Sequence, residues 1–332
     1  MGLVSLAAHN VTAFASGLPL QPILDDFVLV RATILQYRLE SVRALYVNIH
    51  EAMLVLSGGI EDAIKWANKI LDQTRGRKLD PSQKNSTAWG FIMCSQIAYY
   101  FGDLQLAADN HKRFIPLVDV DKFYAKIIFS AFFQLMIATG LYRETGKSKR
   151  KYERSARQAL KAMKGIIKTK GLNSVHKLIL MEAEYKATFS KRSSMREIKD
   201  GFETAISSAA RAGFMQDAAL GNELAGTWFL RFGDIDWARY YLTRAANCYA
   251  DWGAHAKAKQ LRKLYPSYVE GQKVDTRGTK TSLGTRGGMI ARVTNKLISG
   301  SFPGGAEDSA DSQGGTWTGT SSRYRNGESS RH

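Results

Sequence analysis

Cysteine and proline are scarce in this sequence. Its 332 residues contain two cysteines, Cys94 and Cys248, and six prolines. The two cysteines have neither a metal-binding nor a redox spacing, so we expect a reducing, cytoplasmic environment. Few prolines and few alternating Val-rich runs argue against a β-sandwich. Long stretches rich in Ala, Leu, Lys and Arg favour α-helix instead.

Long hydrophobic runs are also lacking. The longest, Ile127 to Tyr142, is shorter than the roughly 20 residues that a bilayer-spanning helix needs, and Gln134 interrupts it. We therefore predict a buried core helix there and no transmembrane segment. The start of the chain is mildly apolar but lacks the basic region of a signal peptide. Leu6 stands where a myristoylation pattern has Ser or Thr.

Known catalytic motifs are missing as well. The segment Gly140–Ser148 resembles a phosphate-binding loop, but five residues instead of four precede its Gly-Lys-Ser. His50-Glu51 is not followed by the second histidine of a zinc-protease helix, because Leu54 stands there. No nucleophile elbow or kinase catalytic loop is present. We expect no catalytic residue, no metal, no cofactor and no enzymatic activity in this chain.

Positive charge is abundant and partly local. The formal net charge is +17, and the segment Arg143–Lys170 holds 11 basic and two acidic residues. We predict one helix over this segment, with a candidate basic surface. Such a surface can bind nucleic acid or an anionic membrane, although a charged helix face is more often only solvated. The candidate residues are Lys147, Lys149, Arg150, Lys151, Arg154 and Arg157.

Helical patterns joined by turns fill most of the chain. After a turn with Pro19 and Pro22, the pattern predicts one long helix over Ile23–Leu56. Gly58 and Gly59 end it. The remaining predicted segments before the buried helix are a helix opened by Glu61-Asp62, a loop over Arg75–Ser86, helices over Trp89–Phe101 and Leu104–Phe114, and a stop at Pro116.

One stretch has the spacing of a helical repeat. Its small and apolar residues fall at positions 8, 11, 15, 20, 24 and 27 of a 34-residue tetratricopeptide template. They are Gly226, Phe229, Gly233, Ala238, Leu242 and Ala245. The units around Gly59 and Gly102 match the template partially. We predict an all-α fold of antiparallel helix-pair repeats, a tetratricopeptide-like α-solenoid.

Composition divides the chain into three parts. We predict an N-terminal lead-in at 1–22, a helical repeat domain at 23–270 and a tail at 271–332. The tail is basic at first and then rich in Gly and Ser, so we expect it to be disordered. Its short apolar patch, Met289–Ile298, is read as a flexible linker, with a docking helix as the alternative.

The region from about Leu18 to Pro266 resembles the tetratricopeptide-like helical region of STAND-type ATPase signalling proteins, which are kinase, histidine-kinase or cyclase hybrids. Its C-terminal part is the more specific, and the loop Ser190–Glu197 departs from the family pattern by lacking a turn glycine. The residues that carry the resemblance are Asn173, His176, Lys177, Glu182, Ala183, Glu184, Ala205, Ile206, Gly213, Phe214, Ala219, Leu220, Glu223, Leu224, Ala225, Gly233, Asp234, Ala238, Tyr241, Ala245, Tyr249, Trp252, Gly253, Ala254, Lys257, Tyr265 and Pro266.

The resemblance implies a regulatory role in signal transduction. None of the family's catalytic domains is in this sequence, so any ATPase or kinase activity would lie outside it, and we expect either a freestanding module or a fragment of a larger chain. The expected partner is a peptide or a neighbouring domain held in the concave face of the repeats. A basic adaptor for nucleic acid or anionic membrane, acting through 143–170, is the alternative. The aromatic residues near the end of the array are expected to pack in the core, with a ligand groove as the second interpretation.

Overall fold

A computed structural model describes residues 2–37, 40–74, 84–117, 124–170 and 172–269. Within these ranges the secondary structure is helical throughout and no strand occurs, so the predicted all-α class is confirmed. The predicted tail and its apolar patch lie outside the described residues. The helices are α1 (Gly2–Ala15), α2 (Leu20–Gln36), α3 (Glu40–Ser57), α4 (Ala63–Thr74), α5 (Lys84–Phe101), α6 (Leu104–Phe114), α7 (Tyr124–Thr145), α8 (Lys149–Lys170), α9 (Val175–Phe189), α10 (Met195–Arg211), α11 (Met215–Phe232), α12 (Ile235–Trp252) and α13 (His255–Leu264).

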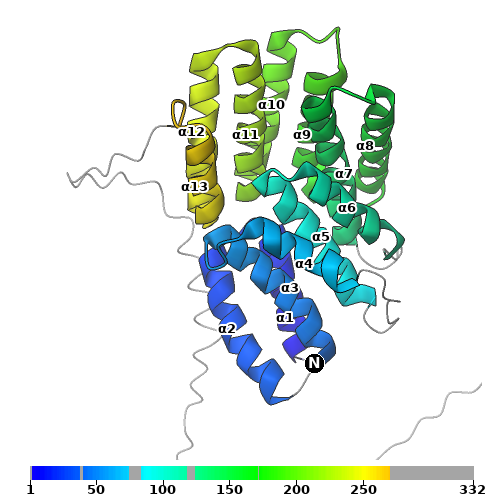
Figure 1. The fold of residues 1–332 in the computed structure, drawn as a ribbon, viewed down its shortest axis with the longest axis vertical. Helices are drawn as coiled ribbons and strands as arrows, with labels where there is room; N and C mark the ends of the chain where they lie inside the picture. The colour runs from blue at the N-terminus through cyan, green and yellow to red at the C-terminus, as the bar shows by residue number, and fades with distance from the viewer. Residues whose placement is uncertain (1, 38–39, 75–83, 118–123, 171, 270–332) are drawn as a thin grey trace, which may run out of the picture. The chain divides into compact units, whose positions relative to one another are not determined.

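Helices that follow one another in sequence pack against one another in space. The closest neighbours are α5 with α6, α7 with α8, α9 with α10, and α11 with α12. Figure 1 shows α9 to α12 standing side by side. The last helix, α13, packs on α12 and also returns to α3 and α5. The helical array therefore brings its C-terminal helix into contact with helices from its N-terminal third.

The pair α11 and α12 shows why the repeat spacing works. Gly226 lies where the two helices approach, and a Cβ on it would stand 2.7 Å from the Cγ of Leu242. Gly233 ends α11 with a left-handed φ of +77°, which favours glycine. Asp234 then caps α12 by accepting a hydrogen bond from the amide of Trp237 at 3.2 Å. The other residues of the spacing, Phe229, Ala238, Leu242 and Ala245, are buried.

The single helix predicted over Ile23–Leu56 is wrong. The structure has two helices, α2 and α3, with a turn at Tyr37. Helix α2 also starts earlier than expected, at Leu20, because Pro22 is compatible with the first turn of a helix, where its missing N–H is not needed. Helix α3 begins at Glu40.

The single helix predicted over Arg143–Lys170 is also wrong. Helix α7 ends at Thr145 and α8 begins at Lys149. The joint contains Gly146 and Ser148 with left-handed φ angles of +64° and +56°, which no continuous helix allows. Arg143 therefore belongs to α7, and the basic segment is divided between two helices and their joint.

The segment expected as a lead-in forms α1 and packs on α2 and α3. The Asn10 amide donates to the Tyr46 hydroxyl at 3.0 Å. The same end of the chain contacts its other end, because the Trp252 indole N–H donates to the carbonyl of Leu18 at 3.1 Å and its ring stacks on Phe14. These contacts join α1 and the α1–α2 turn to the end of α12.

The apolar segment Ile127–Tyr142 lies within α7, and its burial confirms the predicted core helix. Phe132, Phe133, Leu135 and Met136 are each at most 1% exposed. In the described part of the chain, none of the helices combines the length and the apolar character needed to cross a membrane.

The contact at Gly226 makes a prediction about stability. We expect Gly226→Ala to destabilise the fold by up to about 2 kcal/mol, the difference between an overpacking cost of roughly 1–3 kcal/mol and a helix-propensity gain of about 1 kcal/mol. Gly165 on α8 is the matched control, since a Cβ there meets nothing within 4 Å. Gly165→Ala should stabilise the fold by about 0.5–1 kcal/mol. Denaturant unfolding measures both, and equal stabilities of the two variants would contradict the prediction.

Candidate ligand pocket among helices α5, α7 and α11

A pocket of about 250 Å³ lies among residues of α5, α7 and α11. Helix α11 lines it with one stripe, at positions 220, 223, 224, 227 and 231, which a helix places on the same face. We name it the arginine pocket, after the two arginines in its lining. Its lining residues are Tyr99, Tyr100, Gly102, Leu104, Gly140, Arg143, Leu220, Glu223, Leu224, Thr227, Arg231 and Tyr265.

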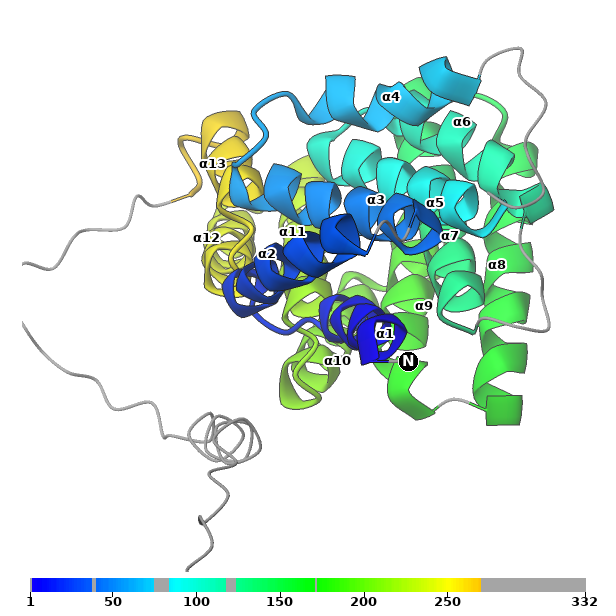
Figure 2. The same ribbon diagram turned by 90° about the horizontal axis from the view of Figure 1, so that it is seen from below.

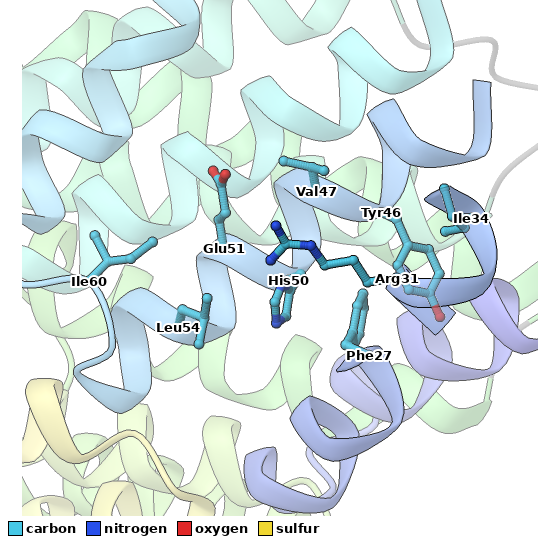
Figure 3. Close-up of a pocket in the computed structure, with 9 residues that line it drawn as sticks. All are labelled: Phe27, Arg31, Ile34, Tyr46, Val47, His50, Glu51, Leu54 and Ile60. Atoms are coloured by element: carbon cyan, nitrogen blue, oxygen red, sulfur yellow. The ribbon is translucent and has the colours of Figure 1, made fainter. Parts of the chain in front are cut away.

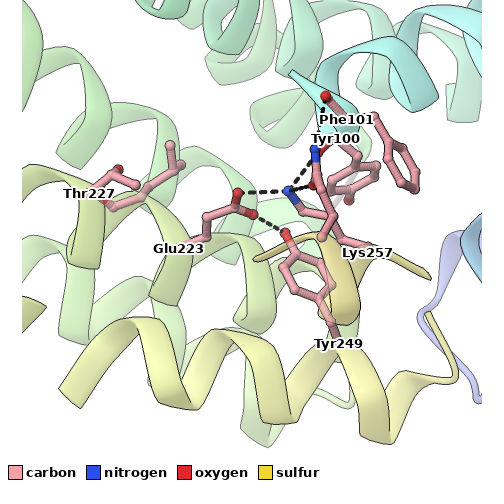
Figure 4. Close-up of polar contacts among 8 residues, drawn as sticks. Tyr100, Phe101, Glu223, Thr227, Tyr249 and Lys257 are labelled. Carbon is pink, nitrogen blue, oxygen red and sulfur yellow. Dashed lines mark hydrogen bonds and ion pairs between the residues drawn. The ribbon is translucent and has the colours of Figure 1, made fainter. Parts of the chain in front are cut away.

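A buried ionic network forms one wall of this pocket (Figure 4). The Lys257 ammonium donates to Glu223 Oε1 at 2.7 Å, to the carbonyl of Tyr100 at 2.5 Å and to Gln260 Oε1 at 3.0 Å. Lys257 is 2% exposed, so these three acceptors replace water for all three of its N–H groups. The other carboxylate oxygen of Glu223 accepts from the Tyr249 hydroxyl at 2.7 Å. Both carboxylate oxygens of Glu223 are therefore bonded within the protein.

The network also completes the C-terminal end of α5. The last carbonyls of a helix have no partner within it. Lys257 donates to the carbonyl of Tyr100, and the Gln260 amide donates to the carbonyl of Phe101 at 2.9 Å. Both donors belong to α13, more than 150 residues away in sequence. Helix α13 is therefore attached to α5 and α11 by polar bonds as well as by packing.

Arg143 reaches the pocket from α7 and is anchored on α9. Its Nη1 forms an ion pair with Glu184 and donates to the Thr188 hydroxyl at 3.0 Å. Burial lowers the pKa of Arg143 to about 10, and the charge of Arg231 acts in the same direction while Tyr99 opposes it. A pKa of about 10 keeps the guanidinium charged at neutral pH. Its Nε and Nη2 have no acceptor among the described residues.

Arg231 enters the pocket from the last turn of α11. Its residue is exposed, and its guanidinium has no hydrogen bond or ion pair within the described part of the chain. The protein atoms around the guanidinium partly desolvate it and lower its pKa, with the nearby Tyr265 opposing that effect. The hydroxyls of Tyr99 and Tyr265 likewise have no acceptor among these residues. Burial raises the pKa of both phenols, so they keep their protons and can donate.

A second ionic group holds α9 in place beside α11. Asp217 accepts from Lys177 Nζ at 2.5 and 2.7 Å and pairs with His176 Nε2 at 2.7 Å, with all three side chains buried. Burial alone would raise the pKa of Asp217, but the charge of Lys177 and the bond from His176 outweigh it and lower this pKa. This group fixes the helix that carries Glu184, the partner of Arg143.

A separate cleft of about 390 Å³ lies between α2 and α3 and reaches Ile60 (Figure 3). Its walls are mostly apolar, and the Phe27 ring stacks on His50 with 5.1 Å between centroids. Burial lowers the pKa of His50, and the charge of Arg31 adds to this. The one carboxylate, Glu51, already accepts from the Trp66 indole and pairs with Lys69. The one carboxylate in the described lining of this cleft is therefore already bonded within the protein.

Within the described residues, no group of three or more His, Cys, Asp or Glu side chains is arranged to hold a metal ion. Most of the aromatic residues that we expected in the core are there, since Trp228, Trp252, Tyr241 and Tyr249 are fully buried. Trp237 and Tyr240 are instead 38% and 46% exposed and lie at the surface of α12.

The candidate basic residues lie on α8 and at its start. The side chains of Lys147, Arg150 and Arg154 are exposed and have no partner among the described residues. Lys151 is exposed and contacts the Tyr152 ring, and Lys149 is half-buried. Arg157 is exposed but bonded to Glu153 at 2.6 Å and to the Tyr185 hydroxyl at 2.8 Å. Of the six candidate cations, Arg157 is thus paired with a carboxylate.

Sequence reasoning missed the arginine pocket. Arg143 was counted with the basic segment, and Arg231 was not singled out. The sequence did single out two residues of the ionic network beside the pocket, because Glu223 and Lys257 are among the residues that carry the family resemblance. The 3–4 residue spacing along α11 also marks one face, but no sequence pattern connects that face with α5 and α7.

No protein-family model, curated protein or solved structure matches this chain. The resemblance to STAND-type signalling proteins therefore stays a hypothesis from sequence.

The buried network makes a second prediction about stability. Lys257→Met should destabilise the chain by about 3–5 kcal/mol, because it removes the cation from a buried pair and leaves the carbonyl of Tyr100 without a donor. Lys186 is the control, since its pair with Glu197 is about half exposed on both sides. Lys186→Met should cost less than about 1 kcal/mol. Equal losses in urea unfolding would show that the network contributes no more than a surface ion pair.

Proposed function

We propose that this chain is a non-catalytic helical-repeat module that binds a peptide, or a segment of a neighbouring domain, in the arginine pocket. The observation that carries the proposal is a pocket built from several helix pairs whose donors have no protein acceptor: Arg231, part of Arg143, Tyr99 and Tyr265. Unpaired polar groups in a recess are costly unless water or a ligand satisfies them. Leu104, Leu220 and Leu224 add apolar surface, which a peptide side chain can cover.

We further propose that the module is regulatory and belongs to signalling proteins of the ATPase or kinase type. Its support is the resemblance of Leu18–Pro266 to the helical region of STAND-type proteins. Helical repeats expose extended surfaces that a peptide or an adjoining domain can occupy, and such binding can bias a neighbouring catalytic domain between two states.

Peptide selection with a blocked pocket tests the proposal. We expect the full chain to enrich a defined motif from a library of random twelve-residue peptides, and Thr227→Trp to abolish that enrichment by filling the pocket. Thr204→Trp is the control, because Thr204 is an exposed helical threonine on α10 that also donates to a preceding backbone carbonyl. Enrichment of no motif, or of motifs that survive Thr227→Trp, would overturn the proposal.

A second candidate function is binding of nucleic acid or anionic membrane through α8. The observation that favours it is the exposed cations Lys147, Arg150 and Arg154, whose side chains have no acidic partner among the described residues. Cations free of intramolecular pairing can neutralise phosphates at no cost of breaking existing pairs.

Salt dependence tests this second candidate. If α8 contacts about six phosphates, affinity for duplex DNA should fall roughly 10³-fold between about 50 and 200 mM salt. The test variant reverses the charges of Lys149, Arg150, Lys151, Arg154 and Arg157, which should abolish binding to DNA or, in a parallel arm, to vesicles containing phosphatidylserine. The control variant reverses Lys112, Arg113, Lys191, Arg192 and Arg196, which changes the net charge equally but lies on α6, on α10 and in the loop between α9 and α10. Equal losses in the two variants would mean that only total charge matters.

A further inference from the structure

The charges of the arginine pocket do not balance. Arg143 is paired with Glu184, and Lys257 is paired with Glu223. Arg231 alone has no counter-ion within the described part of the chain, although it shares the pocket with Arg143. The pocket therefore has one positive charge in excess.

The free hydrogen-bonding groups of the pocket can all donate, and its guanidinium groups can only donate. They are the guanidinium of Arg231, the Nε and Nη2 groups of Arg143, and the hydroxyls of Tyr99 and Tyr265. The one carboxylate in the lining, Glu223, already accepts from Lys257 and Tyr249. A ligand that fits this set must bring acceptors, and an anion brings the strongest ones. A cationic ligand would meet the excess positive charge of the pocket, and the one carboxylate in its lining is already bonded.

The two arginines also repel each other. The charge of Arg231 is one of the causes that lower the pKa of Arg143. An anion bound between two like charges converts this repulsion into attraction to both. One uncompensated guanidinium matches one negative charge, which a carboxylate carries at neutral pH, whereas a phosphate monoester carries close to two. Leu104, Leu220 and Leu224 supply the apolar wall that the carbon atoms beside a carboxylate need.

We infer that the arginine pocket recognises a peptide carboxylate, from an acidic side chain or a free C-terminus, with Arg231 as its principal contact and Arg143 as the second. This inference rests on the proposed peptide-binding function and names the chemistry that the function would use. Arg231 then acts as the specificity-determining residue, while Glu223 and Lys257 hold the wall of the pocket.

Defined peptides and an Arg231 variant test the inference. The probes are tetraglutamate and tetraglutamine, both N-acetylated and C-amidated, and N-acetyl tetraglycine with a free carboxylate. The full chain should bind tetraglutamate more tightly than tetraglutamine in calorimetric titrations. Arg231→Gln should weaken tetraglutamate binding roughly 10- to 100-fold, the amount expected for one charge-assisted hydrogen-bonding partner, and Arg231→Lys should restore part of it. Tetraglycine shows whether a C-terminal carboxylate suffices.

Arg239 is the control for net charge, because it is an exposed arginine on α12 outside the pocket with no partner among the described residues. Arg239→Gln should leave the affinity for tetraglutamate within about twofold, since an exposed charge outside the contact contributes little. Equal weakening by Arg231→Gln and Arg239→Gln would overturn the inference, as would tighter binding of inorganic phosphate that depends on Arg231. If library peptides bind and are sensitive to Thr227→Trp but not to Arg231→Gln, the carboxylate inference fails while the proposed function stands.

Discussion

The attachment of α13 through Lys257 is the interaction on which the candidate site depends. The ammonium of a lysine that is 2% exposed needs acceptors in place of water, and Glu223, Tyr100 and Gln260 provide three. The same bonds complete the C-terminal end of α5 and engage Glu223. One buried cation therefore connects three helices that are distant in sequence. It also neutralises the only carboxylate in the pocket lining, which would otherwise repel an anionic ligand.

The two buried ionic groups connect different pairs of helices. Asp217 with His176 and Lys177 joins α9 to α11, and Lys257 with Glu223 joins α13 to α11 and α5. Both groups are anchored on α11, the helix that lines the pocket with five residues. A ligand in the pocket would thus contact the helix that carries the carboxylates of both ionic groups.

Several features of this fold could be read from the sequence because they are local. The spacing from Gly226 to Ala245 indicates that two adjacent helices approach closely, and Gly233 indicates a left-handed turn between them. The length and apolarity of Ile127–Tyr142 report a buried helix. The breaks at Tyr37 and at Gly146–Ser148 were missed because helical periodicity continues across them, and a turn of two or three residues hardly disturbs it.

The sequence by itself determined the helical class, the joint between α11 and α12 and the concentration of cations before and along α8, since each depends on residues that are close in the chain. Only the tertiary structure decided which charges are paired. Arg143 meets Glu184 across 41 residues, and Lys257 meets the carbonyl of Tyr100 across 157. An ion pair depends on atoms a few ångströms apart, and periodicity along one helix carries no information about which helix it faces. For that reason Arg231, the pocket cation that has no partner among the described residues, could be recognised only once the helices were packed.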